Sequence, residues 1–254
     1  MDSMALQRQM LENNPEYRHN CQIMHDLCLH LSSLARELAP RLDALQEHCS
    51  SNTVHKVYAS GSTLHRGYYC PSPTYDIIIG NTKRGKLLKH LTTKSNPSHE
   101  YGFDKEGKLL YCKTFHNRRL AYTEYLIYED QRALGITISA TGNLHILTEE
   151  VLHDGRLTDY FYGLFVPQGN EGLCYEITTE HYEYDKEGLC ACDMRNYLHT
   201  SSIPADIPLK VLSFIPKQVY RHIGRYQFER ENGLLVRYTN QSGRAFQIHI
   251  ARNA

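Results

Sequence analysis

The chain has 254 residues, of which 41% are hydrophobic and 22% are charged, and its formal net charge is zero. This composition is that of a globular protein and excludes an intrinsically disordered chain. Leu, Ile and Val never form the run of roughly 18–20 residues that a membrane-spanning helix needs. Residues 1–4 are not a basic region leading into an apolar one, so no signal peptide is visible. We therefore expect a cytoplasmic protein with a hydrophobic core and no membrane partner.

The first predicted element is a helix over residues 15–48. Asn14 suits the N-cap position, and Pro15 suits the first helical position. Apolar side chains then recur at alternating steps of four and three residues, which places them in one stripe: Tyr17, Cys21, Met24, Cys28, Leu31, Ala35, Leu38, Leu42 and Leu45. Two further leucines widen the stripe, which favours packing on a broad sheet over the alternative of a coiled coil. Pro40 is predicted to kink or split the helix.

From about residue 98 onward, apolar and polar residues alternate, which is typical of β-strands. The stretches 101–109, 182–189 and 226–234 each read as aromatic, any residue, aromatic, acid, base, Glu, Gly and Leu, with slight slips. Such a stretch predicts a hairpin, because alternate aromatic residues share one strand face and glycine adopts the positive φ of the turn. The 19 tyrosines of the chain suit half-buried strands. The predicted fold is therefore α+β, with an N-terminal helix packed on a large Tyr-rich antiparallel β-meander sheet.

The expected organisation has three segments that form one continuous domain. Residues 1–52 are the N-terminal helical segment, residues 53–97 are a mixed connecting segment, and residues 98–254 are the antiparallel β-meander domain. Within the last, residues 207–216 fit a short helix or a connector. The eight cysteines form no C-x-x-C pair, which predicts buried free thiols and no zinc site.

The motif Tyr184-Asp185-Lys186-Glu187-Gly188 resembles the degenerate YD-type or MORN-variant hairpin repeats of bacteria. The resemblance covers about residues 98–190 and 220–250, and the segment 203–208 interrupts it. Short bacterial proteins with such repeats are often antitoxins or immunity proteins. The resemblance therefore implies that class for this chain.

A second, short motif resembles the nucleotidyltransferase pattern. An apolar segment ends in Gly61-Ser62, and Asp76 opens another apolar segment after thirteen intervening residues. In that family, Gly-Ser holds the phosphates and two carboxylates on one strand hold two metal ions. The second acidic position is Ile78 here, so we predict no catalytic residue, no metal and no cofactor. A degenerate nucleotidyltransferase-like protein, or an enzyme of unknown type, stays an alternative.

Charge is unevenly distributed along the chain. Residues 120–187, here called the acidic block, contain three basic and thirteen acidic residues, a net charge of −10, whereas residues 53–119 carry +8. Such a block creates a negative field that speeds encounter with a basic partner. Alternatively, flanking basic strands neutralise it within the fold. Nucleic acid is disfavoured as a partner, because the basic segments lack the aromatic interleaving of a known nucleic-acid-binding module.

These observations favour a protein-binding protein, in the sharpest version an immunity protein or antitoxin that neutralises a basic toxin domain through an acidic sheet surface. A structural scaffold module is a third alternative. The predicted partner-binding residues lie on strand faces within the acidic block: Tyr122, Glu124, Tyr128, Asp159, Tyr160 and Tyr162. Tyrosine provides contact area at low entropic cost, and the acids steer the approach. Alternation does not reveal whether such a face is exposed or lies beneath the helix.

Overall fold

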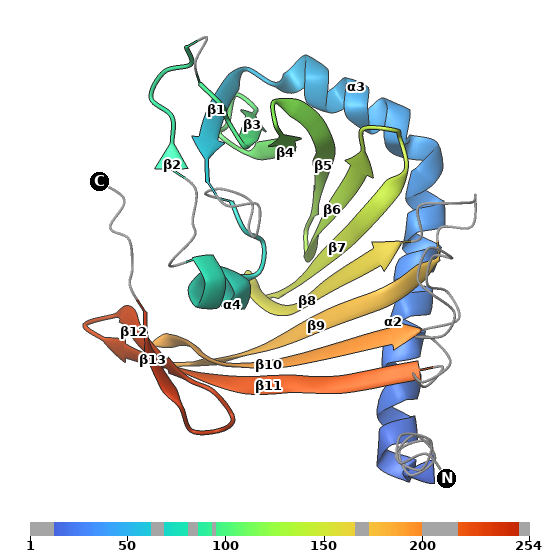
Figure 1. Cartoon of the computed structure of the whole chain (residues 1–254), viewed down its shortest axis with the longest axis vertical. Coiled ribbons are helices and arrows are strands. Elements are labelled where there is room, and N and C mark those ends of the chain that lie inside the picture. Colours follow the sequence, from blue (N-terminus) through green and yellow to red (C-terminus); the bar gives the residue numbers. More distant parts are fainter. Residues whose placement is uncertain are drawn as a thin grey trace.

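The computed structural model describes residues 13–61, 69–80, 86–92, 95–165, 173–199 and 218–248. A large antiparallel sheet curls around a short helical segment, and the N-terminal helices run along the outer face of the curl (Figure 1). The α+β class predicted from the sequence is confirmed, as is the antiparallel sheet.

The predicted N-terminal helix is present in two pieces. Helix α2 (Pro15–Leu38) is followed by the 3₁₀ turn η1 (Ala39–Arg41) and by helix α3 (Leu42–Asn52). The Asn14 side chain caps α2 by accepting hydrogen bonds from the backbone N–H groups of Glu16 and Tyr17. Pro40 lies in the 3₁₀ turn, where its missing N–H and its ring interrupt the α-helical ladder. No described helix is both long and apolar enough to cross a membrane.

The described strands form a thirteen-stranded sheet in which every paired neighbour is antiparallel. The strands are β1 (His55–Ser60), β2 (Lys86–Leu87), β3 (His99–Phe103), β4 (Leu109–His116), β5 (Arg119–Glu129), β6 (Arg132–Ser139), β7 (Leu144–His153), β8 (Arg156–Phe165), β9 (Cys174–Asp185), β10 (Gly188–His199), β11 (Gln218–Glu231), β12 (Leu234–Thr239) and β13 (Ala245–Gln247). From β3 to β13 each strand pairs with the next along the chain, whereas β1 lies between β3 and β2.

The turns between these strands follow the local sequence. At the β7–β8 turn, Asp154 and Gly155 have φ of 50° and 72°, which is the left-handed pair of a two-residue hairpin loop. At the β3–β4 turn, the Asp104 carboxylate accepts hydrogen bonds from the backbone N–H groups of Glu106 and Lys108. The short helix or connector predicted at 207–216 lies outside the described residues.

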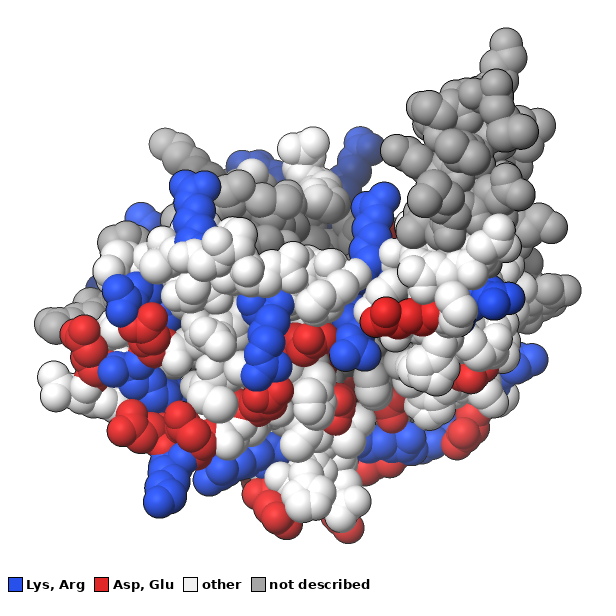
Figure 2. Space-filling view, turned by 90° about the horizontal axis from the view of Figure 1, so that it is seen from below, with Lys and Arg blue, Asp and Glu red and all other residues white. Residues whose placement is uncertain are grey.

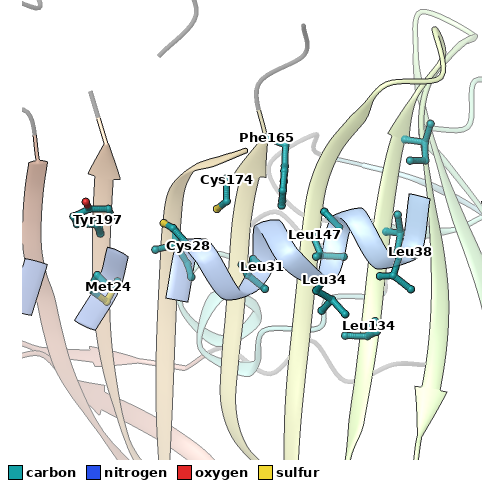
Figure 3. Packing of buried hydrophobic residues seen from close by; sticks show 14 of the residues in the cluster. Met24, Cys28, Leu31, Leu34, Leu38, Leu134, Leu147, Phe165, Cys174 and Tyr197 are labelled. Atoms are coloured by element: carbon teal, nitrogen blue, oxygen red, sulfur yellow. The ribbon is translucent and has the colours of Figure 1, made fainter. Parts of the chain in front are cut away.

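The main hydrophobic core lies between α2 and the outer face of the sheet. Leu31 is fully buried, and with Leu34 it belongs to the cluster that contains Leu134, Leu147 and Phe165 (Figure 3). Burying one such leucine side chain contributes about 1.5–3 kcal/mol. The stripe read from the sequence is therefore the face that holds α2 on the sheet. All eight cysteines are free, and six of them are buried.

Residues 69–80 cover part of the inner face of the sheet. This segment contains the short helix α4 (Pro73–Tyr75) and the π-helical turn η2 (Asp76–Gly80). The nucleotidyltransferase pattern would require a strand at Asp76, whereas here Asp76 begins a π-helical turn. Ser72 caps a helical turn by accepting a hydrogen bond from the Tyr75 N–H, and Pro73 fits its first position. Ile77 and Ile78 then pack against the cluster of buried residues on the inner face.

Candidate functional site

A cavity of about 640 Å³ lies on the inner face of the sheet, between residues 70–78 and the strands from β3 to β11. Its wall combines tyrosine, histidine, threonine and aliphatic side chains with two glutamates, Glu124 and Glu180. These side chains share one face because residues two apart in a strand point the same way. The register brings strands that are distant in the sequence into one wall.

Glu180 fastens the covering segment to the sheet. Its carboxylate accepts hydrogen bonds from the Ser72 hydroxyl, at 2.7 and 2.9 Å to the two oxygens, and from the Tyr182 hydroxyl. Glu180 is only 3% exposed. Burial raises the pKa of Glu180, and the hydrogen bonds from Tyr182 and Ser72 partly offset this. This carboxylate therefore has a positioning role at the cover of the cavity.

Glu124 and Thr137 form the polar part of the wall on β5 and β6. They are directly paired across the two strands and are 2% and 4% exposed. The Thr137 hydroxyl has no hydrogen-bond partner among the described residues. A Cβ atom at Gly135 would lie 2.5 Å from Glu124 Oε1, so the carboxylate occupies space that only a glycine leaves open. A buried carboxylate therefore stands next to an unsatisfied hydroxyl.

Aromatic rings line another part of the cavity. Tyr122 stacks on His145, with ring centroids 4.8 Å apart and planes at 14°, and His116 meets Tyr122 edge-on at 6.4 Å. Tyr160 is buried and Tyr162 is half-buried on β8. Burial lowers the pKa of His145, so this imidazole is uncharged at neutral pH.

The described residues that line the cavity include two carboxylates and no Lys or Arg. Burial raises the pKa of Glu180, and its oxygens already accept hydrogen bonds from Ser72 and Tyr182, so Glu124 is the carboxylate that would favour a positively charged group over an anion.

No model of a known protein family matches the chain, and a search of curated proteins finds no similar sequence. Among the described residues, no group of three or more His, Cys, Asp or Glu side chains is arranged to hold a metal ion.

The structure brings together four of the six residues predicted to bind a partner. Tyr122, Glu124, Tyr160 and Tyr162 all line the cavity. Alternation along β5 and β8 predicted that each pair shares a face, but it did not reveal that Glu124 and Tyr160 are buried.

The other two predicted residues lie elsewhere. Tyr128 is exposed beyond the cavity, where its hydroxyl donates to the Leu109 carbonyl at 3.0 Å and Lys108 Nζ lies 4.2 Å from its ring centroid. Asp159 lies next to Tyr160 and therefore points to the opposite face, where its carboxylate is 2.7 Å from His181 Nδ1. The six residues do not form one surface.

Sequence reasoning missed Thr137, Glu180 and the cover at residues 69–80. Thr137 and Glu180 are ordinary alternating residues of strands, and no local signal distinguishes them. The Ser72-Pro73 pair is a helix-start signal that was readable from the sequence.

The acidic block is partly neutralised within the fold. Glu149 contacts His30 and Arg132, Asp159 contacts His181, and Glu183 pairs with Arg225 of β11 at 2.6 Å. On the face shown in Figure 2, acidic and basic side chains are interspersed. Of these contacts, the pair of Glu183 with Arg225 is the one that joins the block to a flanking strand, as the neutralisation alternative requires.

Proposed function

We propose that the chain is a binding protein and that the inner-face cavity receives a positively charged group of its partner. The observation that carries this proposal is the charge of the cavity wall. The buried carboxylate Glu124 lies in a wall whose described residues include no Lys or Arg, whereas Glu180 is already engaged by Ser72 and Tyr182. A cation that enters would gain charge-assisted hydrogen bonds in surroundings of low dielectric constant.

The partner proposed is a basic protein. A cavity of about 640 Å³ exceeds the needs of one side chain and suits a short loop that carries Lys or Arg. In its sharpest form, the partner is a toxin domain, and this chain is an immunity protein or antitoxin that encloses a basic loop of the toxin. The resemblance to bacterial hairpin repeats supports this form.

The cavity is a better candidate for the contact than the outward-facing acids of the block. Asp159 and Glu183 already have basic partners on the sheet, at 2.7 and 2.6 Å. Surface pairs of this kind add little to association and are screened by salt. Glu124 differs because it is buried within the cavity wall, where water screens its charge less.

The test is association of the purified chain with the products of neighbouring genes, measured with two matched variants. Glu124→Gln removes the charge in the cavity and keeps the shape, whereas Asp159→Asn removes a charge on the outer face. We expect Glu124→Gln to weaken association by about 2 kcal/mol or more, and Asp159→Asn to change it by less than about 1 kcal/mol. Equal effects, or no effect of Glu124→Gln, would contradict the cavity as the contact. If no neighbouring product binds the wild type, the antitoxin form is wrong.

A further inference from the structure

We infer that the same cavity binds a small organic ammonium ion, with its N–H groups against Glu124 and Thr137 and its hydrocarbon part against the tyrosine rings. This inference rests on the site proposed above and names a ligand class for it. The ligand enters as a free molecule and needs no partner protein.

The size of the cavity fits such a ligand. Its volume is about 640 Å³, and sites for small molecules typically measure about 300–1,000 Å³. The wall is continuous across strands that are rigidly paired, so the site exists before the ligand arrives.

The polar part of the wall favours a ligand that donates hydrogen bonds and carries positive charge. The Thr137 hydroxyl is buried without a partner among the described residues, and leaving such a group unsatisfied costs free energy. Glu124 is the directly paired residue on the neighbouring strand, and a carboxylate bonds a charged donor more strongly than a neutral one. An ammonium nitrogen can donate to both groups at once.

The rest of the wall suits hydrocarbon and disfavours anions. Tyr122 and Tyr162 provide aromatic surface, and Ile146 and Met194 also line the cavity. Aromatic faces also attract cations. His145 is uncharged at neutral pH because burial lowers its pKa. The described lining residues include no Lys or Arg, the side chains that would bind a carboxylate or phosphate.

Three probes of similar size and different charge test the inference on the full chain at pH 7. They are 2-phenylethylammonium, 2-phenylethanol and 3-phenylpropanoate, and the dissociation constants are measured by NMR titration. We expect the ammonium to bind about tenfold or more tightly than the alcohol, since charge-assisted hydrogen bonds are roughly twice as strong as neutral ones. The carboxylate should bind most weakly. Equal binding of the ammonium and the alcohol, or tighter binding of the carboxylate, would overturn the inference.

Two isosteric variants locate the binding site. In Glu124→Gln, the preference for the ammonium over the alcohol should disappear. In Thr137→Val, the affinity for the ammonium should fall several-fold while the preference over the alcohol persists. Asp159→Asn is the control and should bind as the wild type does. Thr137→Val removes an unsatisfied hydroxyl, so it should fold at least as well as the wild type and keeps the test valid if Glu124→Gln is unstable. An unchanged affinity in both cavity variants would place any binding elsewhere and overturn the inference.

The outcome separates this inference from the proposed function. If a protein partner binds through Glu124 and the ammonium does not bind, the inference is wrong and the proposed function stands. If the ammonium binds through Glu124 and no protein association depends on this residue, the partner proposal is wrong and the inference stands.

Discussion

At the scale of single residues, Glu180 shows how one carboxylate organises the site. It accepts hydrogen bonds from Ser72 and Tyr182, and so it ties the cover of the cavity to β9. The geometry favours the charged form through these bonds, but burial outweighs them and raises the pKa of Glu180 above its ordinary value of 4.5. Its protonation is therefore linked to the stability of the fold.

The linkage predicts a pH dependence that Glu180→Gln removes. Because the pKa is higher in the folded state, the folded wild type binds the proton more tightly than the unfolded chain does. The stability that this tighter proton binding contributes is therefore fully present below about pH 4.5, and it is lost as the pH rises through the pKa of Glu180 in the folded state. Gln does not titrate. The free energy of unfolding of Glu180→Gln minus that of the wild type should therefore increase as the pH rises through this range. Urea unfolding between pH 4 and pH 8 measures the difference, and a constant or falling difference would refute the linkage.

Residue alternation explains which site residues the sequence could predict. It grouped Tyr122 with Glu124 and Tyr160 with Tyr162, because residues two apart share a strand face. It could not distinguish Thr137 from other strand threonines, since the importance of Thr137 depends on its pairing with Glu124 on another strand. How deeply these side chains are buried depends on the cover at residues 69–80, and strand periodicity does not predict that cover.

At the scale of elements, α2 packs on the outer face of the sheet through one stripe of apolar side chains. Leu31 is fully buried in the cluster below the helix, whereas Leu29 is 49% exposed on the same helix. Both are leucines in helical positions, so intrinsic helix propensity is the same for both. They differ in packing alone, which makes them a matched pair.

We therefore predict that Leu31→Ala lowers the free energy of unfolding by about 2–5 kcal/mol, because it removes buried apolar atoms and leaves a cavity. Leu29→Ala should change it by less than about 0.5 kcal/mol. Chemical denaturation of both variants measures the contrast. Similar effects of the two substitutions would mean that α2 does not pack on the sheet as described.

Elements with strong local signals were predictable, and those set by distant contacts were not. Asn14, Pro15 and Pro40 fixed the start and the interruption of the helix, and the polar-Gly turns fixed the hairpins. The position of β1 was not predictable, because it pairs with β3 at Ala59 and His99, forty residues apart in the sequence. The helical turn that begins at Asp76 was likewise not predicted, because only a mixed connecting segment was expected there.

At the scale of the whole molecule, the distribution of charge along the sequence differs from its distribution in space. The acidic block has a net charge of −10, yet Glu183 pairs with Arg225 of β11, and Glu149 contacts His30 of α2. Folding brings these segments together, so sequence blocks alone overstate the surface field. The acid that matters most for the proposed function, Glu124, lies within the curl of the sheet.

The most direct test of the proposed binding site is photo-cross-linking to a partner protein from the two faces of the sheet. A photoreactive p-benzoylphenylalanine replaces Tyr162 in the cavity wall in one variant and His181 on the outer face in another. A partner captured from the neighbouring gene products should cross-link from position 162 and not from position 181. Cross-linking from position 181 alone would place the contact on the outer face and contradict the proposed binding site.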